Sequence, residues 1–311
     1  MKKKIVILTG PTAVGKSELG IRLAKDVGGE IISADSMQVY RGMDIGTAKI
    51  KGSEMNGVKH YLIDILDPDE EFNVSSFVDH ANDALDKIYA DCAIPIVVGG
   101  TAFYIQALLK QVDFSDDSGK DEALRSRLEE KSTDELYGKL LEADPESCEI
   151  IHKNNKKRII RALEYYYMTG EKISEHNAAQ KQKEPDFDFA YFVLTDERSR
   201  LYDRIDARVD KMMDAGLEDE VKGLMAAGFD AGLTSMQAIG YKEMRACIEG
   251  EISRETAVGL IKQNTRHFAK RQLTWFRKEP DVIWIDYSET GTESRVLLDI
   301  IKRNLKDRGI I

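Results

Sequence analysis

The sequence predicts an α/β protein built on a parallel sheet, with a helical segment inserted into it. Three observations predict this class. Short apolar runs alternate with segments of helical spacing along the first hundred residues. A glycine loop, "GPTAVGKS" at residues 10–17, follows directly after the first apolar run. Residues 116–183 are highly charged and carry no strand pattern.

The N-terminal elements follow from these patterns. "KIVILT" before the loop is a buried parallel strand, and residues 16–27 form a helix with Leu19, Leu23 and Val27 on one face. That helix ends at the glycine pair of residues 28–29. We expect further strands at "EIISAD", "YLIDIL" (residues 61–66) and "IPIVVGGT" (residues 94–101), with a helix at "FVDHANDALDKIYA" between the last two.

The C-terminal half returns to the sheet. "FAYFVLT" (residues 189–195) and "VIWID" (residues 282–286) are predicted strands, and Leu201, Ile205 and Val209 mark one face of a helix between them. We therefore divide the chain into a core of residues 1–115 and 189–311 and a helical insertion of residues 116–188.

Composition excludes several classes of protein. There is no apolar run of twenty residues, so we expect no membrane partner. The short apolar stretch at the N-terminus continues directly into the glycine loop, whereas a signal peptide would continue into a cleavage site of small residues. The three cysteines are widely spaced, which supports neither a zinc site nor a disulfide framework and favours the cytoplasm. The formal net charge of −10 argues against non-specific coating of nucleic acid.

Two local basic segments stand out in this acidic chain. Residues 153–161, "KNNKKRIIR", carry five Lys or Arg, and residues 262–278, "KQNTRHFAKRQLTWFRK", carry six; neither contains an acid. On charge alone they are either nucleic-acid contacts or ordinary solvated helix faces.

The glycine loop fits the pattern G-x-x-x-x-G-K-[ST] between a strand and a helix, which is typical of phosphate binding and of ATP-binding proteins. Gly10 and Gly15 allow successive N–H groups to turn toward phosphate oxygens, and the helix start adds positive charge. Lys16 is expected to reach the phosphates, and Ser17 to be a ligand of Mg2+. The pattern does not distinguish a triphosphate from a diphosphate ester.

Two other side chains are expected beside this loop. Asp35 ends the second strand and Thr101 follows another, and the carboxyl ends of parallel strands share one edge of a sheet. Asp35 is there either a metal ligand or a general base.

Seven segments in order closely resemble bacterial tRNA dimethylallyltransferases: "GPTAVGKS", "ISADSMQVYRGMDIGTAK", "HYLIDILDP", "VVGGTAFYI", "RIIRALEYY", "AIGYKE" and "TRHFAKRQLTWFR". The resemblance implies a phosphate-loop, nucleotide-kinase-like core. It also implies transfer of a dimethylallyl group from dimethylallyl diphosphate to N6 of the adenosine at tRNA position 37, just 3′ of the anticodon. Diphosphate is released, Mg2+ is the cofactor, and we expect the enzyme to act as a monomer.

The resemblance also implies roles for individual residues. Catalysis falls to Asp35 as the base, Thr101 and Arg208. The diphosphate is held by Gly10, Pro11, Thr12, Ala13, Val14, Gly15, Lys16 and Ser17. The tRNA is contacted by Asp35, Ser36, Met37, Gln38, Lys157, Arg158 and Arg161, and by the C-terminal residues Arg266, Lys270, Arg271 and Arg277.

The sequence is also compatible with three other functions. The same core is used by small-molecule phosphotransferases with ATP as donor, and much of the motif set is shared by adenylate isopentenyltransferases, which act on a free nucleotide. A non-catalytic nucleotide-binding switch is the third alternative. The long insertion and the C-terminal basic segment favour tRNA, because a free nucleotide requires neither.

Overall fold

The computed structural model describes residues 2–112 and 121–311. The chain divides into two compact units, the core of Met1–Leu109 with Asp186–Ile311 and the insertion of Lys110–Pro185. Of the insertion expected from the sequence, 116–188, the first five residues lie outside the described ranges.

The core contains a six-stranded parallel sheet in the order β3-β2-β4-β1-β5-β6. This confirms the predicted α/β class. The central strands β1, β4 and β5 are mostly apolar and buried beyond their first residues, as expected for parallel strands that helices cover on both faces. The strands are β1 (Lys3–Thr9), β2 (Gly29–Ala34), β3 (His60–Tyr61), β4 (Ile94–Gly99), β5 (Phe187–Thr195) and β6 (Val282–Asp286).

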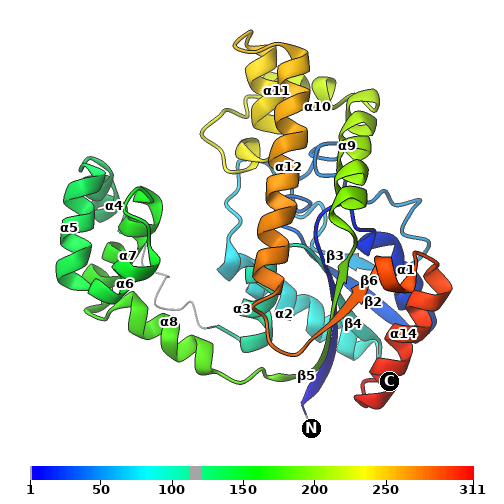
Figure 1. Ribbon diagram of the computed structural model, residues 1–311. Helices are drawn as coiled ribbons and strands as arrows, with labels where there is room; N and C mark the ends of the chain where they lie inside the picture. The colour runs from blue at the N-terminus through cyan, green and yellow to red at the C-terminus, as the bar shows by residue number, and fades with distance from the viewer. Residues whose placement is uncertain (1, 113–120) are drawn as a thin grey trace. The chain divides into compact units, whose positions relative to one another are not determined.

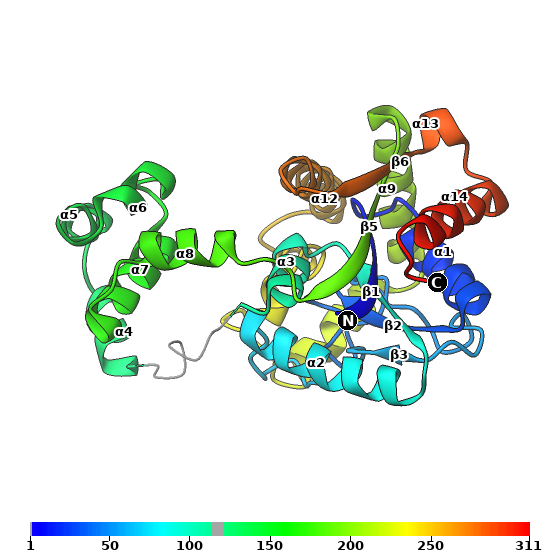
Figure 2. The same cartoon turned by 90° about the horizontal axis from the view of Figure 1, so that it is seen from below.

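Helices form a layer on each side of this sheet (Figure 2). On one side α1 (Lys16–Val27) and α14 (Ser294–Asp307) pack on alternate residues of the strands, such as Leu8 and Phe192. On the other side lie α2 (Val74–Ala90) and α3 (Ala102–Lys110).

A second group of helices stands beyond the carboxyl ends of the strands (Figure 1). It comprises α9 (Arg198–Asp214), α10 (Leu217–Ala226), η2 (Ser235–Gln237), α11 (Tyr241–Ile248) and the long α12 (Arg254–Phe276). The chain then returns through β6 to the short α13 (Tyr287–Thr290). This group therefore surrounds the edge of the sheet at which ligands bind in α/β proteins.

The described residues of the insertion are helical, with a core of its own around Leu136, Leu140 and Leu163. Asp144 is fully buried there and accepts hydrogen bonds from the N–H and hydroxyl groups of both Ser147 and Ser174. The helices are α4 (Glu122–Glu129), α5 (Thr133–Ala143), α6 (Pro145–Ile150), α7 (Lys156–Thr169) and α8 (Ile173–Gln182).

One predicted strand is largely wrong. Of residues 61–66 only Tyr61 belongs to a strand, β3. Leu62 and Asp64 adopt positive φ angles of 62° and 53°, which break the extended conformation. The segment turns so that the N–H groups of Ile65 and Leu66 both donate to the Val39 carbonyl.

Among the described residues, no helix is long and apolar enough to cross a membrane.

Candidate active site

The strand order brings three predicted residues to one edge of the sheet. Strands β2, β4 and β1 are neighbours, so Asp35, Thr101 and Gly10 follow adjacent strand ends. The backbone N–H of Thr101 donates to the Ala34 carbonyl at 3.2 Å, which fixes the start of α3 beside Asp35.

The loop of residues 10–17 leaves a row of backbone donors available. Gly10 has a φ of 148°, and a Cβ there would lie 2.5 Å from the Leu194 carbonyl oxygen, so the close approach to β5 requires glycine. Within the described part of the chain, the N–H groups of Ala13, Gly15 and Lys16 donate to no other group. Unpaired N–H groups at a helix start form a binding site for an anion.

Gln272 of α12 fixes this loop against the neighbouring strand. Its side-chain oxygen accepts from Thr12 N–H at 2.9 Å, and its amide nitrogen donates to the Gly100 carbonyl at 2.9 Å. The side chain is buried. Gln272 thus has a structural role, and it determines the distance between the loop and the end of β4.

Lys16, Arg208 and Asp35 form an electrostatically coupled group. Burial, assisted by the nearby charge of Arg208, lowers the pKa of Lys16 to about 7, while Asp35 acts in the opposite direction. Burial also lowers the pKa of Arg208, again opposed by Asp35. Below about pH 7, where Lys16 is protonated, two partly desolvated cations beside one carboxylate give this site excess positive charge, which favours an anionic ligand.

Asp35 is held by a local turn. Its Oδ1 accepts from the N–H groups of Met37 at 2.9 Å and Gln38 at 3.3 Å. In the described residues no hydrogen bond occupies Oδ2. Gln38 in turn donates to the Thr47 carbonyl at 3.4 Å. The turn therefore leaves one carboxylate oxygen available to accept a proton.

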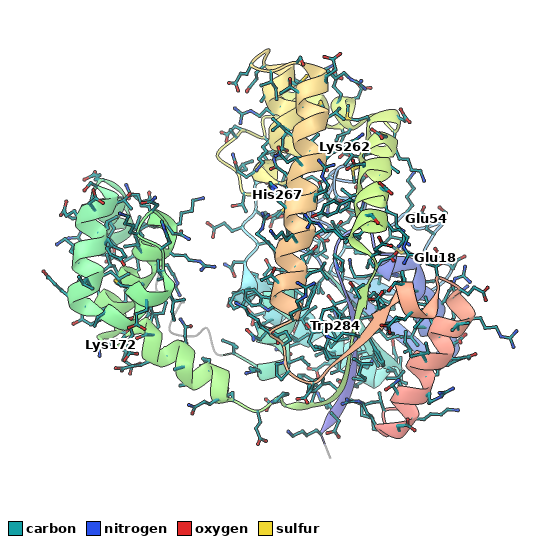
Figure 3. The ribbon with its side chains drawn as sticks, in the orientation of Figure 1. Glu18, Glu54, Lys172, Lys262, His267 and Trp284 are labelled. Carbon is teal, nitrogen blue, oxygen red and sulfur yellow. The ribbon has the colours of Figure 1, made fainter. Side chains whose placement is uncertain are left out.

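The basic residues of α12 fall into two groups. Arg266 pairs with Asp206 at 2.6 Å and Lys262 with Asp210 at 2.6 Å, which joins α12 to α9. Figure 3 shows Lys262 and His267 projecting from different sides of α12. Lys270, Arg271 and Arg277 are exposed, and none is in an ion pair within the described ranges.

Two cavities of about 530 Å³ flank the C-terminal half of α12, and Lys270 lines both. The His267 cavity is lined by His267, Lys270, Arg271, Thr274, Trp275 and Lys278. The Trp284 cavity lies toward α9 and β6, and its lining includes Arg198, Tyr202, Arg277 and Trp284. Trp275 is 37% exposed and packs edge-on against Phe103, so it is partly a packing residue.

The basic segment of the insertion lies at the start of α7. Asn155 caps this helix, and Lys157 and Arg158 are exposed on its first turn. Arg161 is half-buried, and burial lowers the pKa of its guanidinium.

A family model described as IPP transferase matches residues 38–279 of the sequence. The chain belongs to the IPP transferase family. A curated tRNA dimethylallyltransferase of Lachnoclostridium phytofermentans is 54% identical over 302 residues, which cover 96% of each chain. Another, of Carboxydothermus hydrogenoformans, is 48% identical and covers 100% of this chain and 99% of its own.

Solved structures agree with this membership. The crystal structure of a full-length tRNA isopentenylpyrophosphate transferase of Bacillus halodurans has a TM-score of 0.75 and 40% identity, covering 99% of this chain and 98% of its own. A eukaryotic dimethylallyltransferase acting on tRNA has a TM-score of 0.86 and 32% identity, covering 98% of this chain and 80% of its own.

The oxygen donors of this IPP transferase at the loop fit a magnesium ion bound together with a substrate. Mg2+ usually keeps several waters and takes one or two protein oxygens beside phosphate oxygens. The Ser17 hydroxyl is exposed at the start of α1 and forms no hydrogen bond within the described ranges. No cluster of three or more His, Cys, Asp or Glu that could hold a metal occurs among the described residues.

Several residues near the candidate site or lining its neighbouring cavities could not be identified from the sequence. Tyr104, buried on α3, is within electrostatic range of Asp35. Arg198 and Trp284 line a cavity although they are 86 residues apart. Glu220 accepts hydrogen bonds from the backbone of residues 44–46, in the segment that follows Asp35. These residues are distant in sequence and carry no local motif, so only the fold identifies them.

Proposed function

We propose that this protein is a tRNA dimethylallyltransferase, which transfers the dimethylallyl group of dimethylallyl diphosphate to N6 of the adenosine 3′ of the anticodon. One observation carries the proposal beyond the names of its relatives. Asp35, whose Oδ2 has no hydrogen-bond partner among the described residues, lies beside a cationic site formed by Lys16, Arg208 and loop N–H groups that are likewise unpaired there. A base next to a diphosphate site is what amine prenylation requires.

The donor's diphosphate would occupy the loop of residues 10–17. The C1–O bond breaks, and the electron pair leaves with the diphosphate oxygen. Lys16, Arg208 and the loop N–H groups would stabilise the growing negative charge. When bound at Ser17, magnesium would offset part of the diphosphate charge. Thr101, at the adjoining strand end, would position the reactants.

The acceptor's N6 forms the new bond to C1 and loses one proton. This amine is a weak nucleophile because its lone pair is delocalised into the adenine ring. Asp35 would take the proton on its free oxygen, and Gln38 and the neighbouring residues Ser36 and Met37 would orient the base. A well-placed general base of this kind contributes roughly 10²–10⁴-fold.

The RNA would contact basic side chains of the core and, separately, basic side chains of the insertion. We assign phosphate contacts to Lys270 and Arg271 on α12, where the His267 cavity offers cations beside an aromatic ring, and to Arg277, which follows α12 and lines the Trp284 cavity. Arg266 stays a proposed contact, although its guanidinium already pairs with Asp206. On α7 the proposed contacts are Lys157, Arg158 and Arg161. The target adenosine must leave its stack to reach the strand ends.

We further propose that the enzyme acts as a monomer in the cytoplasm. The three free cysteines support a reducing compartment.

The test is incubation of the protein with dimethylallyl diphosphate, magnesium and unmodified tRNA, followed by nucleoside analysis. The expected product is N6-dimethylallyladenosine at the position 3′ of the anticodon. Prenylation of free AMP in preference to tRNA would instead identify an adenylate isopentenyltransferase. Turnover of ATP with a small acceptor, and none of dimethylallyl diphosphate, would identify a phosphotransferase.

A further inference from the structure

The Glu220 carboxylate on α10 accepts four hydrogen bonds from groups that are distant in sequence. Its carboxylate accepts from the backbone N–H groups of Asp44 at 3.0 Å, Ile45 at 2.7 Å and Gly46 at 3.0 Å. It also accepts from the Tyr241 hydroxyl at 2.6 Å. Three consecutive N–H groups on one carboxylate fix the path of that backbone, because a charged acceptor makes stronger hydrogen bonds than a neutral one.

The same segment is held on its other sides. Gly46 lies flat against the Tyr241 ring, and a Cβ at this position would overlap the ring. Lys49 is buried and donates to the Tyr40 carbonyl, to Asp44 at 2.6 Å and to Asp64 at 2.5 Å. Residues 44–49 therefore have one fixed conformation, with Glu220 supplying the acceptors on the side of α10.

That conformation places a single carbonyl between two side chains of the candidate site. The Thr47 carbonyl accepts from Arg208 Nη2 at 3.3 Å and from Gln38 Nε2 at 3.4 Å. Arg208 comes from α9 and Gln38 from the turn after β2, and no other hydrogen bond of either side chain occurs among the described residues. Thr47 thus sets the direction of both groups.

We propose that Glu220 is a positioning residue for prenyl transfer: it fixes residues 44–47 so that the Thr47 carbonyl holds Arg208 against the leaving diphosphate and Gln38 against the acceptor base. This inference rests on the proposed function. Glu220 itself touches neither substrate. Its effect passes through the backbone, so it should appear in the rate of transfer more than in the affinity for RNA.

The test compares Glu220→Gln with Glu218→Gln, the same change on the same helix at a side chain whose partners among the described residues are Lys222 and Arg254. A Gln side chain has a single acceptor oxygen, so at least one of the three backbone N–H groups loses its partner. We expect the single-turnover rate of folded Glu220→Gln to fall on the order of tenfold. Affinity for tRNA should stay near that of wild type, and Glu218→Gln should keep the wild-type rate.

A double-mutant cycle separates positioning from a general loss of structure. If Glu220 acts through Arg208, Glu220→Gln should cost no more than about threefold in an Arg208→Lys background. Tyr241→Phe keeps the ring against Gly46 but removes one hydrogen bond, so it provides a milder variant with a smaller fall in the same rate if Glu220→Gln does not fold.

Three results would overturn the proposal: equal rates for the two glutamine variants, a fully additive cost in the Arg208→Lys background, or an unchanged rate in Tyr241→Phe when Glu220→Gln is unfolded. Absence of prenyl transfer by the wild-type enzyme is a separate outcome. It would refute the proposed function and this inference together.

Discussion

Under the proposed function, the lowered pKa of Lys16 makes the affinity for the diphosphate donor depend on pH. The ammonium has a pKa of about 7 in the folded protein, against an ordinary value of 10.5. At pH 8 only about a tenth of the free enzyme then carries this charge, and the diphosphate binds best to the charged form. We expect the affinity for dimethylallyl diphosphate to fall about tenfold per pH unit above 7.

The assay is calorimetric titration of the enzyme with dimethylallyl diphosphate in the absence of RNA. Measured at pH 8 in two buffers of different ionisation enthalpy, the wild type should take up close to one proton per donor bound. Lys16→Arg is the control, because a guanidinium stays charged over this range. Its proton uptake should be near zero and its affinity nearly constant. A wild type that takes up no proton, or an arginine variant with the same pH slope, would refute the reasoning.

The lowered pKa of Lys16 also makes the free energy of unfolding depend on pH. Because the folded pKa of Lys16 lies below the unfolded one, the unfolded chain binds more protons between about pH 7 and 10.5. The contribution of Lys16 to stability therefore rises with pH across this window and is flat below it.

Three further predictions follow from the contacts. Asp35→Asn should lower the single-turnover transfer rate by roughly 10²–10⁴-fold with near-normal affinity for both substrates, as rapid-quench and binding measurements will show. Removing the charges of Lys270 and Arg271 together should weaken tRNA binding and reduce the slope of log affinity against log salt by about 1.5. Asp144→Ala should destabilise the insertion by about 3 kcal/mol, measured by urea unfolding, because four buried donors lose their acceptor.

Each of these has its own control. A rate for Asp35→Asn that recovers when magnesium is raised would make Asp35 a metal residue. Loss of the exposed charges of Arg303 and Lys306 on α14 should leave the salt slope unchanged, and an equal effect of both pairs would assign the α12 cations to an ordinary solvated face. For Asp144→Ala, donor binding by the core should persist.

We also expect the stability of the insertion to depend on pH through Asp144. Burial alone would raise the pKa of Asp144, but the hydrogen bonds from Ser147 and Ser174 outweigh it and hold the pKa below its ordinary value. Its contribution to stability is therefore present above the unfolded pKa and is lost as the pH falls through the folded one.

The sequence predicted the sheet well because its signals are local. The strand before Gly10 and the helix after Gly15 follow from an apolar run and a glycine pattern, which need no knowledge of the rest of the chain. The shared edge of Gly10, Asp35 and Thr101 followed from the rule that parallel strands end together. The segment around Asp64 failed for the opposite reason: its alternating residues look extended, but a lysine fifteen residues earlier and the Val39 carbonyl determine its path.

The candidate site was predictable only in part. Asp35 and Lys16 lie in recognisable motifs, whereas the bridge made by Gln272 and the hydrogen bonds from residues 44–46 to Glu220 join residues more than 170 positions apart. Charge alone also could not separate Arg266, which pairs with Asp206, from Lys270, which forms no ion pair in the part of the chain that the structure describes, since both belong to one basic run. Those distinctions depend on which helix faces α12, and that is set by tertiary packing.

The central claim is that the glycine loop holds the diphosphate that leaves and that no phosphoryl group is transferred. The most direct measurement uses dimethylallyl diphosphate with a deuterated prenyl chain, unmodified tRNA and magnesium, with ATP also present. Mass analysis should find the deuterated prenyl group on N6 of the adenosine 3′ of the anticodon, and one intact diphosphate released per transfer. Formation of ADP with a phosphorylated product, and an unlabelled tRNA, would contradict the account.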